Sequence, residues 1–179
     1  MESISVFDML KVGVGPSSSH TLGPWRAAAR WIEKLKKTEN FDTIERVTVN
    51  LYGSLSLTGK GHATDIAVMM GLLGTDPVTF PIDEIDSAIA RVTSENILKL
   101  NFERDVPFIP KEDIKFNRKF LEFHPNGMTF TAFLKNGKKT SDTYYSIGGG
   151  FLVPKERIFH FPLKKPPNCS RIARPRTRP

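Results

Sequence analysis

Residues 128–147, MTFTAFLKNGKKTSDTYYSI, carry the clearest structural signal in this 179-residue sequence. Every second residue of the run MTFTAFL is apolar, as expected for a strand that buries one face. Asn136-Gly137 then provides a two-residue turn signal, and a second run of strand-forming residues follows over 140–147. The segment therefore predicts an antiparallel β-hairpin.

Upstream of this hairpin, helical and strand patterns follow one another. Apolar residues recur at three- and four-residue spacing over 21–37, which predicts a helix with one apolar face. The predicted helices are 5–13, 21–37, 64–73 and 82–96, and the predicted strands are 45–54, 96–103, 113–117, 128–134 and 140–147. The glycine-punctuated segment 57–62 is interpreted as a loop. This mixture predicts an α+β domain over residues 1–153, with a mixed sheet and flanking helices.

Composition excludes several classes of protein. Hydrophobic residues make up 39% of the chain, enough to build a core. No stretch approaches the roughly 20 apolar residues that cross a bilayer, and the start does not resemble a secretory signal. Cys169 is the single cysteine, so the chain cannot provide an internal disulfide or a four-cysteine metal site. Low cysteine usage indicates a cytoplasmic protein with no membrane association.

The basic character of the chain is concentrated at its end. Residues 155–179 hold eight of the 26 basic residues and one of the 19 acidic residues, so residues 1–154 carry 18 of each. Prolines are also frequent in this segment and disfavour regular structure. We therefore expect 154–179 to be a disordered Pro/Arg-rich tail: a linker, or an aberrant terminus from an altered reading frame. A nucleic-acid-binding arm is a weaker alternative, because the remainder of the chain has no net charge.

Three histidines lie in segments with unusual neighbours. In GPSSSHT, His20 follows Ser17, Ser18 and Ser19 just before a predicted helix, where free N–H groups and hydroxyls can bind an anion. The alternative is a serine-rich helix cap with a solvated histidine. Histidine titrates near neutral pH and can act as a general base.

Two further segments carry candidate residues. In TGKGHATD, Gly59 and Gly61 flank Lys60, and His62 precedes Thr64 at a helix start; an anion site and a capped structural loop are both compatible with this pattern. The spacing is not that of a phosphate-binding Walker loop. In FHPNGM, His124 and Asn126 lie in a turn, where a single histidine is more often structural. Together the residues indicate a site for a small anionic substrate.

Four separated motifs carry a family resemblance. The segments SVFDMLKVGVGPSSSHTLGPWRAA, YGSLSLTGKGHATDIAVMMGLLG, FHPNGM and TYYSIGGGF, in this order, are similar to the N-terminal beta portion of bacterial iron–sulfur L-serine dehydratase, or L-serine ammonia-lyase. The resemblance covers about residues 3–153. It implies a fold similar to the allosteric substrate-binding domain of phosphoglycerate dehydrogenases. It also implies a lyase that converts L-serine to pyruvate and ammonia.

The resemblance further implies roles for particular residues. His62 and His124 become the candidate catalytic residues, and the choice between them as the base stays open. The candidate substrate-binding residues are Ser17, Ser18, Ser19, His20, Lys60, Thr64 and Asn126. Among these, Ser19, Thr64 and Asn126 are expected to hold the carboxylate or amine, and Ser17 and Ser18 to shape the loop.

The family cofactor cannot be bound by this chain alone. The resemblance implies a four-iron four-sulfur cluster, no pyridoxal phosphate, and no metal ligand within this chain. The cluster's cysteines belong to an alpha portion, either a separate chain or a lost C-terminal part. L-serine, this alpha portion and a second copy of the chain are the expected partners. A serine-binding regulatory module without turnover is the alternative function.

Overall fold

The computed structural model describes residues 17–158. The predicted helix 5–13 and residues 159–179 of the predicted tail lie outside the described residues. A mixed five-stranded sheet has the order β4-β1-β5-β6-β7, in which the β1–β4 pair is parallel and the other pairs are antiparallel. Its strands are β1 (Ile44–Tyr52), β4 (Ile114–Asn117), β5 (Gly127–Leu134), β6 (Lys139–Ser146) and β7 (Leu152–Pro154). The predicted mixed-sheet α+β class is confirmed.

The predicted hairpin forms the centre of this sheet. β5 pairs with β6 from Gly127 opposite Tyr145 to Phe133 opposite Lys139. Gly137 closes the turn with φ of 75°, a left-handed conformation that glycine adopts without steric cost. The other edge of β5 pairs with β1. The apolar face of the hairpin packs against the core.

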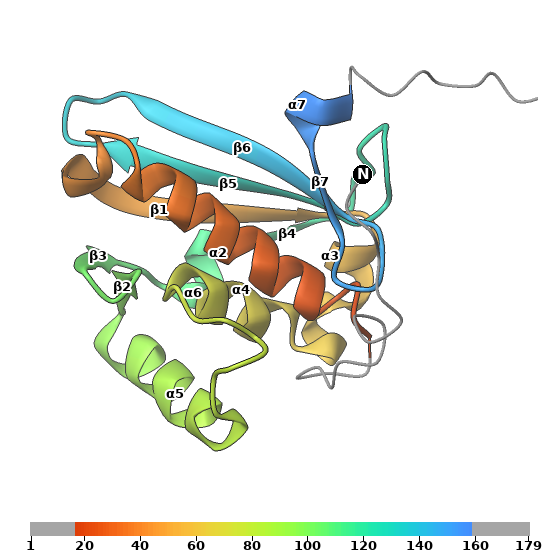
Figure 1. Cartoon of the computed structure of the whole chain (residues 1–179), viewed down its shortest axis with the longest axis horizontal. Coiled ribbons are helices and arrows are strands. Elements are labelled where there is room, and N and C mark those ends of the chain that lie inside the picture. The colour runs from red at the N-terminus through yellow and green to blue at the C-terminus, as the bar shows by residue number, and fades with distance from the viewer. Residues whose placement is uncertain (1–16, 159–179) are drawn as a thin grey trace, which may run out of the picture.

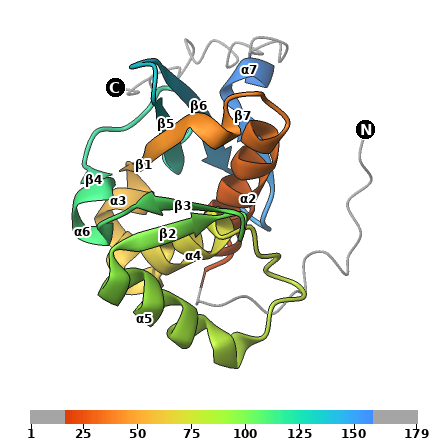
Figure 2. The ribbon, with the colours of Figure 1, turned by 90° about the vertical axis from the view of Figure 1, so that its left-hand side faces the viewer.

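Helices and a second, two-stranded sheet cover one face of the large sheet (Figure 1). Helix α2 crosses β5 and β6 and packs beside α4, while α5 lies farther out next to β2 and β3 (Figure 2). The longer helices are α2 (Leu22–Lys36), α4 (Thr64–Leu72) and α5 (Ile85–Glu95), and the two-stranded sheet is β2 (Ile97–Leu100) and β3 (Arg104–Pro107). The short elements are α3 (Ser54–Thr58), α6 (Pro110–Asp113), α7 (Lys155–Ile158), η1 (Phe41–Thr43), η2 (Gly59–His62) and η3 (Ile82–Glu84).

The core lies between α2 and the large sheet. Trp31 of α2 is fully buried and stacks on Phe130 of β5, with ring centroids 5.3 Å apart. Helix α2 also approaches α4 closely, because a Cβ on Gly71 would lie 2.2 Å from the Trp25 carbonyl oxygen. The small residue therefore allows the end of α4 to pack closely against the start of α2.

Two predicted segments differ from the structure. Residues 57–62, predicted as a loop, form the end of α3 and the turn η2. Gly59 takes a helical φ of −58°, and Phe116 packs where its side chain would lie. The strand predicted over 96–103 ends at Leu100, since Asn101 and Phe102 have φ of 49° and 54° and turn the chain back into β3.

Beyond residue 153, the end of the predicted domain, the chain continues as the last residue of β7 and the short helix α7. Within residues 17–158, no helix is both long enough and apolar enough to cross a membrane.

Candidate functional site

The three histidine segments meet at one end of the large sheet, beside α3 (Figure 1). β1 ends at Tyr52, and the Ser54 backbone N–H two residues later donates to the Pro125 carbonyl at 2.9 Å. This bond joins the turn after β1 to the FHPNGM segment that precedes β5. Ser54 also reaches the GPSSSHT segment, so its backbone and side chain contact different motifs.

The His20 ring is held by hydroxyl groups on both sides. Its Nδ1 lies 3.0 Å from Ser19 Oγ and 3.3 Å from Ser17 Oγ, while its Nε2 lies 3.1 Å from Ser54 Oγ. The side chain is buried. Burial lowers the pKa of His20, and the neighbouring His62 lowers it further, whereas a hydrogen bond to Ser54 acts in the opposite direction. His20 is thus held as a neutral ring at neutral pH.

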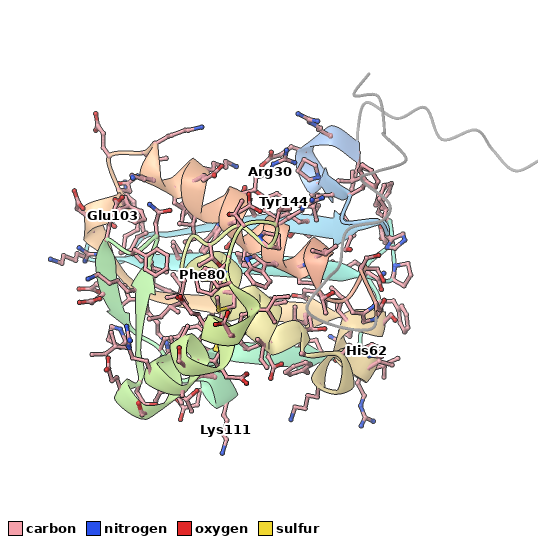
Figure 3. The ribbon with its side chains drawn as sticks, turned by 60° about the horizontal axis from the view of Figure 1, so that its bottom comes forward. Arg30, His62, Phe80, Glu103, Lys111 and Tyr144 are labelled. Carbon is pink, nitrogen blue, oxygen red and sulfur yellow. The ribbon has the colours of Figure 1, made fainter. Side chains whose placement is uncertain are left out.

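His62 lies against His20 at the end of η2 and close to α3 (Figure 3), with ring centroids 5.0 Å apart and planes tilted by 38°. Its Nδ1 lies 2.8 Å from the carbonyl oxygen of Thr58. A carbonyl oxygen can only accept, so Nδ1 carries the proton and the neutral ring has its lone pair on Nε2. Within residues 17–158, Nε2 has no hydrogen-bond partner, which leaves this lone pair available to a substrate proton.

His124 has the opposite tautomer. Its Nδ1 accepts a hydrogen bond from the backbone N–H of Asn126 at 3.1 Å, so the proton of the neutral ring sits on Nε2. Burial lowers the pKa of His124, which favours this neutral form. His124 therefore presents a hydrogen-bond donor, whereas His62 presents an acceptor.

Asn126 and Ser146 contain polar atoms without partners among the described residues. Asn126 is 8% exposed; its Nδ2 donates to the Ser146 carbonyl, and its Oδ1 has no partner. Ser146 is fully buried, and its hydroxyl also lacks a partner. The hydroxyl packs against Gly23 of α2, where a Cβ would lie 2.0 Å away. Buried orphan groups are rare in structural positions and common at binding sites.

The other predicted residues take different positions. Thr64 is fully buried and donates to the His20 carbonyl at 2.8 Å, so it fixes the loop that carries His20. Lys60 is exposed, with its ammonium 5.5 Å from the centroid of the Phe116 ring. Ser18 is also exposed, and its carbonyl accepts from the Gly23 N–H. The structure thus groups Ser17, Ser19, His20, His62 and Thr64, and separately His124 with Asn126.

The proposed anion-binding N–H groups before α2 already have partners. The backbone N–H groups of His20 and Thr21 donate to the Ser17 carbonyl, and that of Gly23 donates to Ser18. These three N–H groups belong to a hydrogen-bonded turn that leads into the helix, and an anion site in this segment stays a prediction. The hydroxyls and imidazoles provide the polar chemistry here.

Sequence reasoning missed two members of this site. Ser54 was not singled out, although its position as the last residue of a predicted strand was a usable signal. The Thr58 carbonyl could not be recognised, since a main-chain acceptor has no signature in the side-chain sequence.

Two other features bear on the location and chemistry of the site. A pocket of about 260 Å³ lies between α5 and the β2–β3 hairpin, lined by Leu73, Ala88, Arg91, Val92, Glu95, Ile97, Lys99, Phe102 and Asp105, and contains no histidine. Over residues 17–158, no three His, Cys, Asp or Glu side chains are placed to hold a metal ion.

Comparison with known proteins agrees with the sequence motifs. The family described as "Serine dehydratase beta chain" matches residues 5–157. L-serine dehydratase of Haemophilus influenzae is 48% identical over 152 residues, covering 84% of this chain and 33% of the relative. L-serine dehydratase 1 of Escherichia coli is 47% identical over 156 residues, covering 87% of this chain and 34% of the relative. The chain belongs to the serine dehydratase beta chain family.

More distant relatives match the same region. L-serine dehydratase of Streptomyces coelicolor is 40% identical over 158 residues, which cover 87% of this chain and 35% of the relative. The chain therefore spans about a third of the length of the curated relatives it matches.

Proposed function

We propose that this chain is the substrate-contributing beta portion of an L-serine dehydratase, which acts with an alpha portion to convert L-serine to pyruvate and ammonia. Membership of the beta chain family supports this proposal. The observation that carries the chemistry is the Nδ1–Thr58 contact of His62, which leaves a basic Nε2 at the centre of the site. We therefore assign the base to His62.

Proton abstraction follows from that tautomer. The lone pair on His62 Nε2 takes the Cα proton of serine, and the Cα–H electron pair forms the Cα–Cβ double bond as the β-hydroxyl leaves. Thr58 then accepts from the Nδ1–H of a positively charged ring, which stabilises the protonated base. The neutral state of His20 helps, because a second positive charge 5.0 Å away would oppose proton uptake. The resulting enamine tautomerises to an imine, and water hydrolyses it to pyruvate and ammonia.

His124 and Asn126 are suited to binding the substrate. The Nε2–H of His124 can donate to the serine carboxylate, and the unpartnered Oδ1 of Asn126 can accept from the amine. In the proposed assignment, Ser19 and Thr64 hold His20 in place. Ser19 contacts the His20 ring, and Thr64 donates a hydrogen bond to the His20 carbonyl. Lys60 contributes long-range attraction for the carboxylate from the surface.

The iron–sulfur cluster implied by the resemblance does not fit this chain. A cluster needs several thiolate ligands, and the sequence has one cysteine, Cys169. We assign the cluster to the alpha portion, and we assign departure of the hydroxyl to no residue of this chain. A homo-oligomer in the cytoplasm is a further part of the proposal.

An anaerobic assay of pyruvate formation tests this function. The chain is incubated with L-serine, iron and sulfide, with and without the alpha portion of a related dehydratase. We expect pyruvate only when the alpha portion is present, and none when His62→Ala replaces the natural chain.

Absence of pyruvate in the presence of a folded, bound alpha portion would contradict the proposal. Calorimetric titration of the chain with L-serine then separates two cases. Millimolar binding without turnover would favour the regulatory serine-binding module, and no binding would argue against both functions.

A further inference from the structure

Ser54 contacts two of the histidine segments at once. Its hydroxyl lies 3.1 Å from His20 Nε2, and its backbone N–H donates to the Pro125 carbonyl at 2.9 Å. It occupies the first position of α3, directly after Gly53, whose φ is 55°. A Cβ on Gly53 would lie 2.3 Å from the Pro125 carbonyl oxygen, so the backbone cannot move toward that loop. The Ser54 hydroxyl is consequently held on a rigid turn.

The His20 ring has no freedom to rotate between these contacts. The hydroxyl of Ser54 meets one ring nitrogen, and the hydroxyl of Ser19 meets the other at 3.0 Å. Ser19 is itself bound to Ser17, with the two oxygens 3.1 Å apart. Removal of Ser54 leaves the second nitrogen of a buried ring without a hydrogen-bond partner, which is unfavourable. The ring would then reorient to find one.

A fixed His20 ring in turn limits His62. His62 is anchored at Nδ1 by the Thr58 carbonyl, and its ring lies against that of His20, with the two centroids 5.0 Å apart. His20 therefore limits the orientations of the His62 ring and so the direction of its Nε2 lone pair. A misplacement of about 1 Å in a reacting group can reduce the rate up to about 100-fold.

We propose that Ser54 is a positioning residue: its hydroxyl holds the His20 ring in one orientation, and His20 in turn orients the Nε2 atom of His62. This inference rests on the proposed function for its effect on turnover. Its structural part stands on the contacts within this chain and can be tested without any activity.

The test uses the full chain with ¹⁵N-labelled histidines. Long-range ¹H–¹⁵N spectra report which ring nitrogen carries the proton, and nuclear Overhauser effects report the contact between the His20 and His62 rings. We expect Ser54→Ala to change the ratio of His20 tautomers and weaken the contact between the rings, and Ser54→Thr, which keeps the hydroxyl, to restore both. Ser56→Ala is the matched control, because Ser56 is the next serine of α3 and has no side-chain hydrogen bond among the described residues.

Unchanged His20 tautomers and ring contacts in a folded Ser54→Ala chain would overturn the proposal, as would the same changes in Ser56→Ala. Should Ser54→Ala fail to fold, Ser54→Cys gives the same readout, because the thiol preserves size but donates weakly. In the assay with the alpha portion, we expect Ser54→Ala to lower kcat by up to about 100-fold with little change in KM. A spectroscopic change without any turnover in the natural chain would contradict the proposed function and leave the positioning role intact.

Discussion

At the residue scale, main-chain partners distinguish two histidines that look equivalent in the sequence. His62 donates its Nδ1 proton to a carbonyl, and His124 accepts at Nδ1 from a backbone N–H. One ring consequently exposes a lone pair and the other a proton. This difference supports the proposed assignment of the base to His62, a choice that the sequence leaves open, and it predicts different behaviour for each variant.

Replacement of His62 and His124 should therefore give different kinetic effects. In the assay with the alpha portion, we expect His62→Ala to lower kcat by about 100-fold or more through loss of the base. His124→Gln keeps an N–H donor, so we expect a raised KM with kcat within about tenfold of the natural chain. Equal losses of kcat in the two variants would contradict the assignment of the base to His62.

The lowered pKa of His20 links stability to pH. The unfolded chain binds a proton near pH 6.5, whereas the folded chain resists protonation until a lower pH. The free energy of unfolding should therefore fall as the pH decreases below about 6.5 and level off below the folded pKa. His124 adds an effect of the same sign, since its pKa is also lowered.

Thermal unfolding between pH 7 and pH 5 measures this dependence. We expect the natural chain to lose more of its Tm over this range than His20→Gln, which cannot take up a proton at this position. If Tm changes by the same amount with pH in both proteins, His20 is not a source of the pH dependence of stability.

At the element scale, contacts between helices and turns place the residues of the site. The approach of α2 to α4 at Gly71 holds the start of α2, which follows His20, against the end of α4. Thr64 reinforces this arrangement through its bond to the His20 carbonyl. Close packing at Gly71 thus fixes the start of α2 against α4, and the Thr64 bond joins the two histidine motifs.

Gly71→Ala tests the role of this close approach. A Cβ would lie 2.2 Å from the Trp25 carbonyl oxygen and 2.6 Å from the Ala28 Cβ, and neither atom belongs to a flexible side-chain end. We expect a net loss of about 1–3 kcal/mol in the free energy of unfolding, measured by urea titration, despite the higher helix propensity of alanine. Gly61→Ala is the control, because no atom lies within 4 Å of its Cβ position. Equal stability of the two variants would argue against tight packing at Gly71.

At the scale of the whole molecule, the end of the sheet that carries the histidines also exposes large apolar side chains. Leu57 is 57% exposed and Phe120 is 61% exposed. Both lie next to Gly53: the Leu57 N–H donates to its carbonyl, and the Phe120 ring packs where its side chain would be. Exposed apolar groups gathered beside a site are typical of a surface that meets another protein. This surface is our candidate for contact with the alpha portion.

The double variant Leu57→Ser/Phe120→Ser tests that surface. We expect it to bind the alpha portion more weakly, so that higher concentrations are needed for pyruvate formation, while Tm changes little because both side chains are exposed. Phe133→Ser is the control, since Phe133 is 38% exposed but lies at the opposite end of β5 from the histidine site. An unchanged concentration dependence in the double variant would exclude this surface as the contact.

The sequence by itself determined the elements that local patterns encode. Alternation and the Asn136-Gly137 turn predicted the β5–β6 hairpin, and apolar spacing predicted α2, α4 and α5 within a few residues. Sequence motifs identified the family and the three histidine segments, because a motif can be recognised without knowledge of tertiary contacts. The β2–β3 hairpin was not predicted, because left-handed residues at 101 and 102 have no strong signature in Asn-Phe.

Only the tertiary structure decided how those segments act together. The tautomers of His62 and His124 depend on a carbonyl and an N–H of the backbone, which every sequence contains and whose direction only folding sets. The side-chain hydrogen bond of Ser54 joins it to His20, which lies 34 positions away in the chain. Local sequence encodes dihedral preferences and apolar periodicity, whereas hydrogen-bond partners between distant segments exist only after the sheet has brought their ends together.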